Sequence, residues 1–337
     1  MIVGAGLYIL HRERVIRRIP LAGSDNIVVG PLQERDLPDA ATIVRQAFGT
    51  FVGAPDLATF WNDRDLVQSR WRAPHVAAFG ATLDGALVGS NFATRWGSVG
   101  YFGPLTIRPD LWDRGIGRQL MAPVMAQFES WRTAHLGLFT FAHSTKHVGL
   151  YERFGFAARY LTAVMAKPAA PSDARPDGQR YGALAAAQRV EALGECRALT
   201  DALFEGLDLG DEIELVRALQ LGDTALVMDD AGVSGFAICH HGPASEAGAG
   251  TCLIKFGAVR PGPAAAQSFD RLIDACETLA VQAGTPTLMA GANMGRPEAY
   301  GHLKQRGFRT EFQGVTMHRP NEPGYSRPGN YVIDDWR

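Results

Sequence analysis

The stretch that decides the fold is Leu105-Thr106-Ile107-Arg108-Pro109, followed by Trp112-Asp113-Arg114-Gly115-Ile116-Gly117 and by Arg118-Gln119-Leu120-Met121. It predicts a buried strand, a short glycine loop and the start of a helix, in that order. Because glycine has no Cβ, Gly115 and Gly117 let the backbone turn tightly and approach a ligand closely. The N–H groups at the positive end of the following helix suit a phosphate. A Gly-x-Gly pair by itself is more often only a turn.

The sequence after the loop has the spacing of an amphipathic helix. Apolar residues recur three or four positions apart, whereas polar residues fill the other face. The apolar set is Leu120, Met121, Val124, Met125, Phe128 and Trp131. The loop therefore leads into a helix, which is the context in which such a loop binds an anion.

A second motif follows this helix. An apolar run at 136–142 precedes Leu150-Tyr151-Glu152-Arg153-Phe154-Gly155-Phe156. With both motifs in this order and at this spacing, the chain resembles the GNAT superfamily of N-acetyltransferases. The resemblance implies that acetyl-CoA is the cosubstrate and that its pyrophosphate lies in the glycine loop. It implies a cofactor site made of Leu105, Thr106, Ile107, Arg114, Gly115, Ile116, Gly117 and Arg118.

The resemblance also implies a catalytic role for Tyr151, which would protonate the departing thiolate. A phenol has an unperturbed pKa of about 10, so it carries this proton at neutral pH. The alternative is that Tyr151 only packs on the cofactor slot. One position departs from the family pattern, because Trp112 stands where the loop usually begins with Arg or Gln. The general base is left unassigned, since His75, His143 and Asp84 are merely nearby in the sequence.

The composition is that of a globular protein with room for two domains. The 337 residues are 46% hydrophobic and 20% charged, and the formal net charge is −2. Without a bulk basic field, nucleic-acid binding is disfavoured. Four cysteines lack metal-ligand spacing and predict buried free thiols in a reducing compartment, and hence a cytoplasmic protein without a metal. They are Cys196, Cys239, Cys252 and Cys276.

The N-terminal extension, residues 1–26, begins with an apolar run at 2–10 that is too short to span a bilayer. The first predicted domain, 27–167, contains the glycine loop. Its earlier elements are a strand at 26–31, a helix at 37–48, a second helix at 56–71 and a hairpin with strands at 76–83 and 86–96. Pro104 predicts a bulge in the strand at 99–107, because proline cannot donate to a ladder. In the resembled family, such a bulge splays neighbouring strands and makes the slot for the pantetheine arm.

An internal repeat at an offset of 152 residues indicates a second GNAT-like domain at 181–318, after a Pro-rich linker at 168–180. Gly257-Ala258-Val259-Arg260-Pro261 matches the strand before the glycine loop. The second copy is degenerate, because alanines at 264–266 replace the loop glycines and Leu303 replaces Tyr151. The neighbouring Tyr300 lies on a different helical face. The C-terminal tail, 319–337, is expected to pack back across a domain surface.

The predicted fold class is therefore α/β, as an α+β mixed sheet, with two tandem GNAT-like domains. Each domain is expected to have a mostly antiparallel central sheet flanked by helices. The leading function is transfer of acetyl from acetyl-CoA to an amine of a small molecule or peptide. Two alternatives stay open, a non-catalytic acyl-CoA-binding or regulatory protein and an aminoacyl-tRNA-dependent transferase. The second of these fits less well, because such tandem transferases lack the CoA loop and this chain is not basic.

Overall fold

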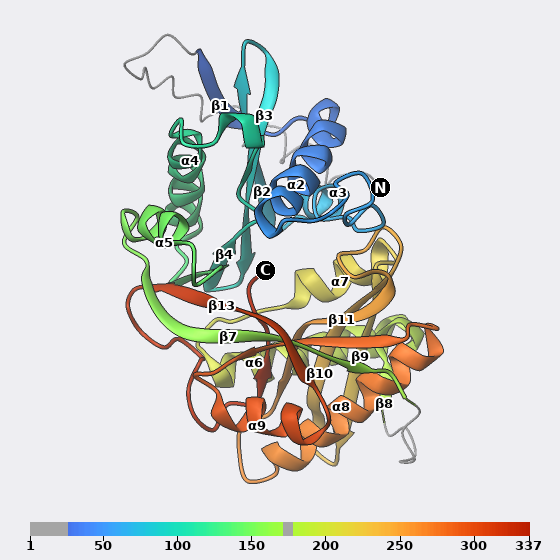
Figure 1. The fold of residues 1–337 in the computed structure, drawn as a ribbon. Helices are drawn as coiled ribbons and strands as arrows, with labels where there is room; N and C mark the ends of the chain where they lie inside the picture. Colours follow the sequence, from blue (N-terminus) through green and yellow to red (C-terminus); the bar gives the residue numbers. More distant parts are fainter. Residues whose placement is uncertain (1–25, 171–177) are drawn as a thin grey trace, which may run out of the picture. The chain divides into compact units, whose positions relative to one another are not determined.

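The computed structural model describes residues 26–170 and 178–337, and these fall into two compact units (Figure 1). The first unit contains the described residues up to Asn62 together with Leu66–Thr94 and Phe102–Arg132. The second unit contains Asp63–Asp65, Arg95–Tyr101 and Thr133–Arg337. The predicted N-terminal extension lies outside the described residues, apart from Asn26.

The first unit is a small antiparallel sheet with helices. Its strands pair in the order β1–β2–β3–β5, each antiparallel to the next. Its elements are β1 (Ile27–Pro31), the 3-10 turn η1 (Glu34–Asp36), α2 (Leu37–Val52), α3 (Gln68–Arg72), β2 (Val76–Leu83), β3 (Ala86–Trp96), β5 (Thr106–Ile107), the 3-10 turn η2 (Pro109–Leu111) and α4 (Ile116–Trp131). The predicted hairpin is present, and Asp84 and Gly85 take the positive φ values of 49° and 84° that a tight hairpin turn requires.

The core of the first unit lies between α2 and the sheet. Leu37, Ile43 and Val44 of α2 pack with Leu87 and Phe92 of β3 in one buried cluster. Helix α2 ends where Gly53 takes φ 69°, a left-handed conformation that glycine adopts without strain. The predicted helix at 37–48 is thus confirmed and runs four residues further.

The predicted helix at 56–71 is wrong for most of its length. Only Gln68–Arg72 is helical. The Asp56 carboxylate accepts hydrogen bonds from the N–H of Ala58 at 2.9 Å and from the Thr59 hydroxyl at 2.9 Å. Such short-range bonds offer the backbone an alternative to a helix, which is why the apolar spacing at 56–67 was misleading.

The strand predicted at 99–107 is interrupted, as Pro104 indicated. Strand β4 (Val99–Phe102) ends before Gly103 and Pro104, and β5 begins at Thr106. The Gly103 N–H still donates to the carbonyl of Phe92 at 2.9 Å, whereas proline has no N–H to donate. The interruption therefore lies where the ladder cannot continue.

The second unit is a mixed sheet covered by helices. Its first strand is β4, as far as Tyr101. The other elements are β6 (His135–Thr140), α5 (Thr145–Glu152), β7 (Ala157–Pro168), β8 (Gly178–Arg180), the 3-10 turn η3 (Tyr181–Ala183), α6 (Ala186–Leu203), α7 (Gly210–Ala218), β9 (Gly222–Asp229), β10 (Gly232–Gly242), β11 (Gly248–Val259), α8 (Ala265–Gln282), β12 (Thr287–Asn293), α9 (Pro297–Gln305), β13 (Arg309–Arg319) and β14 (Val332–Ile333).

Strands of the two sequence repeats are interleaved in this sheet. The order is β4–β6–β13–β7–β12–β11–β10–β9–β8, with β14 paired to β11. Strand β13, from the second repeat, lies between β6 and β7 of the first and is antiparallel to both. In turn β7 pairs antiparallel with β12 of the second repeat. The final strand of each repeat therefore pairs with the other repeat.

This exchange moves the boundary of the compact units away from the predicted linker. Strands β6 and β7 and helix α5 were predicted within the domain at 27–167, but they pack in the second unit. The described end of the predicted linker is not a loop, because Gly178–Arg180 forms the edge strand β8. Sequence composition indicates which segments lack regular structure. Pairing between strands that are distant in the sequence decides which segments belong to one compact unit.

The main core of the second unit lies between α8 and strands β9 to β12. Leu272, Ile273 and Cys276 of α8 pack with Ala237 and Ile254 of the sheet. All four cysteines are buried and free, as predicted. Within residues 26–170 and 178–337, no helix is long and apolar enough to cross a membrane.

Candidate functional site

The strand that enters the glycine loop lies close against its neighbour β3. Thr106 pairs with Ser90, and their hydroxyl oxygens are 3.4 Å apart. Ile107 pairs with Gly89, where a Cβ would lie only 2.7 Å from the carbonyl oxygen of Thr106. Glycine at position 89 is therefore needed for this approach. Leu105, the first predicted site residue, is half-buried just before β5.

The glycine loop leaves backbone donors at the start of α4. Gly115 precedes the helix with φ 76°, and no atom lies within 4 Å of where its Cβ would be. The N–H of Gln119 donates to the carbonyl of Gly115 at 3.3 Å, which begins the helical pattern. The preceding N–H groups, of Ile116, Gly117 and Arg118, come too early in the helix to have an i−4 partner. Three donors thus lie at the positive end of the helix dipole, a setting that suits an anion.

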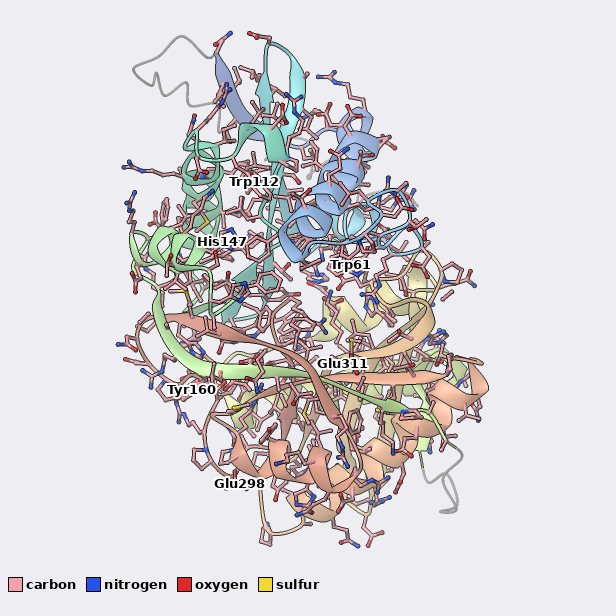
Figure 2. The ribbon with its side chains drawn as sticks, in the orientation of Figure 1. Trp61, Trp112, His147, Tyr160, Glu298 and Glu311 are labelled. Atoms are coloured by element: carbon pink, nitrogen blue, oxygen red, sulfur yellow. The ribbon has the colours of Figure 1, made fainter. Side chains whose placement is uncertain are left out.

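Trp112 fastens this loop to the end of the strand. Its indole Nε1–H donates to the carbonyl oxygen of Ile107 at 2.8 Å (Figure 2 labels Trp112). The sequence marked Trp112 only as a departure from the family pattern. In the structure it holds the loop against β5, and nothing in the sequence indicated this role.

A buried arginine stabilises the backbone between β4 and β5. Arg70 is only 3% exposed, and its Nη1 donates to the carbonyl oxygen of Gly103 at 2.6 Å. A charged donor strengthens this bond. Arg70 lies on α3, more than thirty residues before Gly103, so no sequence motif connects them.

The loop surface carries cationic side chains. Arg114 and Arg118 are exposed on either side of the Gly-x-Gly pair. Nearby, Arg108 Nε donates to Asp110 Oδ1 at 2.7 Å. This hydrogen bond lowers the pKa of Asp110, and the charge of Arg114 adds to the effect. The loop is therefore cationic where its backbone donors converge, which fits a pyrophosphate.

Tyr151 lies in the last turn of α5, in the second unit. The carbonyl of Tyr151 accepts the N–H groups of Phe154 at 2.9 Å and Phe156 at 3.2 Å. Gly155 makes the turn between them with φ 81°. The Tyr151 side chain is only 7% exposed, and burial raises the pKa of its phenol. The hydroxyl therefore keeps its proton at neutral pH, as a proton donor must.

Strands β4 and β6 of the second unit part after a short parallel pairing. Val99 pairs with His135, and the pairing ends at Tyr101 and Gly137. Strand β6 itself continues to Thr140. The pairing thus stops just before Pro104, the residue at which the strand was expected to be interrupted.

The other residues weighed from the sequence lie in three separate loops. His75 is buried, His143 is exposed and Asp84 lies in the exposed hairpin turn. None of these positions is at the glycine loop in sequence or shares an element with it. The general base stays unassigned.

The second repeat lacks both functional features. Helix α8 begins at Ala265, after Ala264, without a Gly-x-Gly pair. Leu303, at the position of Tyr151, is fully buried in the apolar core. Tyr300 is half-buried against that core. These residues of the second repeat support the prediction that it is a degenerate copy.

Comparison with known proteins agrees with the resemblance that the two motifs indicated. Residues 43–156 match the model of the acetyltransferase (GNAT) family. A candidate acetyltransferase from Pyrococcus horikoshii has a TM-score of 0.66 at 12% identity, over 94% of this chain and 96% of that one. A GCN5-related N-acetyltransferase from Sphaerobacter thermophilus has a TM-score of 0.55 at 14% identity, over 87% and 95% of the two chains. No curated protein matches the sequence.

A tandem arrangement also occurs among the similar folds. A tandem GNAT protein from the clavulanic acid biosynthesis pathway has a TM-score of 0.53 at 12% identity, over 87% of this chain and 98% of that one. The predicted fold class is confirmed, since these likenesses extend across both repeats. The family match itself covers the glycine loop and the Tyr151 motif. Residues 43–156 are thus similar in sequence to the acetyltransferase (GNAT) family, and the fold is similar to these acetyltransferase structures.

Proposed function

We propose that the protein is an acyl-CoA-dependent N-acyltransferase that moves acetyl from acetyl-CoA to an amine of a small molecule or peptide. The observation that carries the proposal is the start of α4, where three backbone donors follow the left-handed turn at Gly115. A cationic, open helix start of this kind suits a pyrophosphate. The same feature supports CoA over an aminoacyl-tRNA as the acyl donor.

Each predicted site residue has a place in this proposal. The N–H groups of Ile116, Gly117 and Arg118 would bind the pyrophosphate, with the Arg114 and Arg118 side chains close by. Leu105, Thr106 and Ile107 would lie along the pantetheine arm. Among the described residues β5 pairs with β3 alone, so its second edge is suited to an extended ligand.

The chemistry needs a positioned acyl group, an uncharged amine and a proton for the leaving sulfur. Bound acetyl-CoA supplies the thioester, whose C–S bond breaks as the amine nitrogen forms the new C–N bond. Tyr151 gives its phenolic proton to the sulfur; the phenol is protonated at neutral pH, although burial raises its pKa and so makes it a weaker acid. The amine nitrogen releases one proton to solvent in the same turnover, and solvent returns one proton to the Tyr151 phenolate, so the protons balance.

A direct test begins with the protein as purified. Mass spectrometry of bound small molecules should detect CoA or an acyl-CoA. A screen of amines with acetyl-CoA, read by release of free thiol, should then identify acceptors. CoA binding without thiol release for any amine would favour a non-catalytic acyl-CoA-binding protein. Absence of CoA binding would contradict the proposal.

A further inference from the structure

The C-terminal tail occupies the second repeat's counterpart of the cofactor strand. The repeat offset of 152 residues places 105–107 on Gly257, Ala258 and Val259 of β11. Strand β14 pairs antiparallel with this segment, through Gly257 with Ile333 and Ala258 with Val332. The N–H of Val259 also donates to the carbonyl of Tyr331 at 3.3 Å. A peptide strand thus fills the edge along which a pantetheine arm would lie.

The position of β14 also corresponds to the strand separation. Parallel pairing between β11 and β12 ends at Ile254 and Ala290, although β11 continues to Val259. Beyond that point β14 contacts both strands. The second repeat therefore retains the separated strands of the fold and closes them with its own chain.

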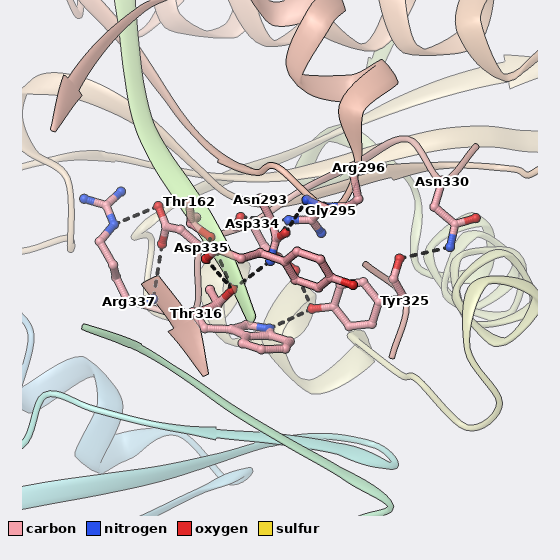
Figure 3. Close-up of polar contacts among 12 residues, drawn as sticks. Thr162, Asn293, Gly295, Arg296, Thr316, Tyr325, Asn330, Asp334, Asp335 and Arg337 are labelled. Carbon is pink, nitrogen blue, oxygen red and sulfur yellow. Dashed lines mark hydrogen bonds and ion pairs between the residues drawn. The ribbon is translucent and has the colours of Figure 1, made fainter. Parts of the chain in front are cut away.

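Buried polar contacts fasten the tail beyond β14 (Figure 3). Arg296 Nη2 and Asp334 Oδ1 form an ion pair at 2.7 Å, with side-chain exposures of 0% and 3%. The Tyr325 hydroxyl donates to the other oxygen of Asp334. Trp336 Nε1 in turn donates to the Tyr325 hydroxyl at 2.7 Å. Breaking a buried pair of this kind is costly, so the tail is held in one conformation.

This anchored tail places Trp336 against β6. A Cβ at Gly137 would overlap the indole of Trp336, so only glycine allows the ring to lie on the strand there. The indole also packs against the rings of His135 and His318, with centroids 6.2 and 4.9 Å away. Gly137 is the last residue of β6 that pairs with β4, through Tyr101. Trp336 thus lies at the point where β4 and β6 part.

We propose that residues 331–337 are a positioning segment for acyl-CoA: anchored as a strand along β11 of the second repeat, they hold Trp336 against Gly137, where the pairing of β4 and β6 ends. This inference rests on the proposed function. The proposed function assigns the pyrophosphate end of the cofactor to the α4 loop of the first unit, whereas Trp336 belongs to the second unit. Trp336 acts instead through β6, on the part of the slot that takes the acyl end.

The test compares two ligands on full-length variants by titration calorimetry. Adenosine 3′,5′-bisphosphate probes the nucleotide end of the site, and acetyl-CoA probes the whole slot. Trp336→Ala should weaken acetyl-CoA binding at least fivefold and change the affinity for the bisphosphate less than twofold. Trp336→Phe, which keeps a ring on Gly137, should restore acetyl-CoA affinity to within twofold of wild type.

A matched control is Leu272→Ala, which truncates a fully buried residue of α8 without touching β6. It should leave both affinities unchanged. Equal acetyl-CoA affinity in wild type and folded Trp336→Ala would overturn the inference, as would an equal loss in Leu272→Ala. Failure of wild type to bind acetyl-CoA would instead overturn the proposed function on which the inference rests.

Hydrogen exchange on the unmodified chain gives a second test, which stands even if Trp336→Ala does not fold. Without ligand, segments 257–259 and 331–333 should already be protected, because they pair with each other. Acetyl-CoA should slow exchange further at 135–140 and 331–337, whereas the bisphosphate should not. Unprotected tail amides, or a tail unaffected by acetyl-CoA, would contradict the inference.

Discussion

At the scale of single residues, a variant of Tyr151 tests whether the protein is an enzyme or only binds acyl-CoA. Tyr151→Phe keeps the ring and its packing but deletes the proton that would go to sulfur. Turnover should fall roughly 10²- to 10⁴-fold, the usual share of general acid catalysis, while KM for acetyl-CoA changes much less. Steady-state kinetics with an identified acceptor measure this. The matched variant Tyr300→Phe, in the second repeat, should be nearly silent, and equal turnover in wild type and Tyr151→Phe would leave Tyr151 a packing residue.

A variant of Gly117 tests whether the glycine loop binds CoA. Gly117→Val adds a branched side chain beside the backbone donors at the start of α4, and this should obstruct the pyrophosphate. We expect CoA affinity to fall at least tenfold in a folded protein, as measured by calorimetry. Gly194→Val is the control, because Gly194 is also a helical glycine and has no atom within 4 Å of its Cβ position. Unchanged CoA affinity in Gly117→Val would remove the loop from the site.

At the scale of elements, the two repeats differ at the proposed cofactor slot of the first and at its counterpart in the second. The first has a glycine loop before α4, whereas the second has alanines before α8 and a peptide strand along β11. One CoA per chain should therefore bind. Equilibrium binding with protein of known active concentration measures the stoichiometry. A value of two would show that β14 is displaced by the cofactor and that the second repeat still binds it.

The interleaved strands are themselves joined by a buried histidine pair. His318 Nδ1 lies 3.1 Å from the carbonyl of Glu322 and 3.0 Å from His135 Nε2. Because a carbonyl can only accept, a hydrogen bond to Glu322 requires the hydrogen to be on His318 Nδ1. Burial lowers the pKa of His135 from 6.5 to about 4 and that of His318 to about 3, with nearby arginines adding to the effect. Both rings are neutral in the folded protein at pH 7.

At the scale of the whole molecule, this pair should make stability depend on pH. As pH falls through 6.5 the unfolded chain takes up protons that the folded chain does not bind until about pH 4. Stability is therefore full above about pH 6.5 and is lost progressively down to pH 4. At pH 5 the loss should be roughly 2 kcal/mol for each histidine. Urea unfolding at pH 7.5 and pH 5 measures it.

Two variants test the assignment of this pH dependence. His318→Gln removes one buried titrating ring and should flatten the pH dependence. His143→Gln removes an exposed histidine and should leave it unchanged. The same slope in wild type and His318→Gln would mean that other groups cause the loss of stability at low pH.

The sequence by itself determined the local features of the site. Gly115 specifies a turn into a helix because few other residues tolerate its left-handed backbone, and Pro104 specifies a break because it lacks an N–H. The repeat at 152 residues showed that the fold is present twice, and it fits β6 with β12 and β7 with β13. The helix predicted at 56–71 failed because the Asp56 side chain competes with helical hydrogen bonding.

Only the tertiary structure decided how the repeats combine. Strands β7 and β13 pair with strands of the other repeat. The Trp112 indole donates a hydrogen bond to the carbonyl of Ile107, and the Trp336 indole packs on Gly137. Periodicity along the chain reports which face of an element is buried but not which partner buries it. Two similar repeats offer similar partners to each strand, so the choice depends on the whole set of packed contacts. For that reason the boundary of the compact units, unlike the motifs, was not readable from the sequence.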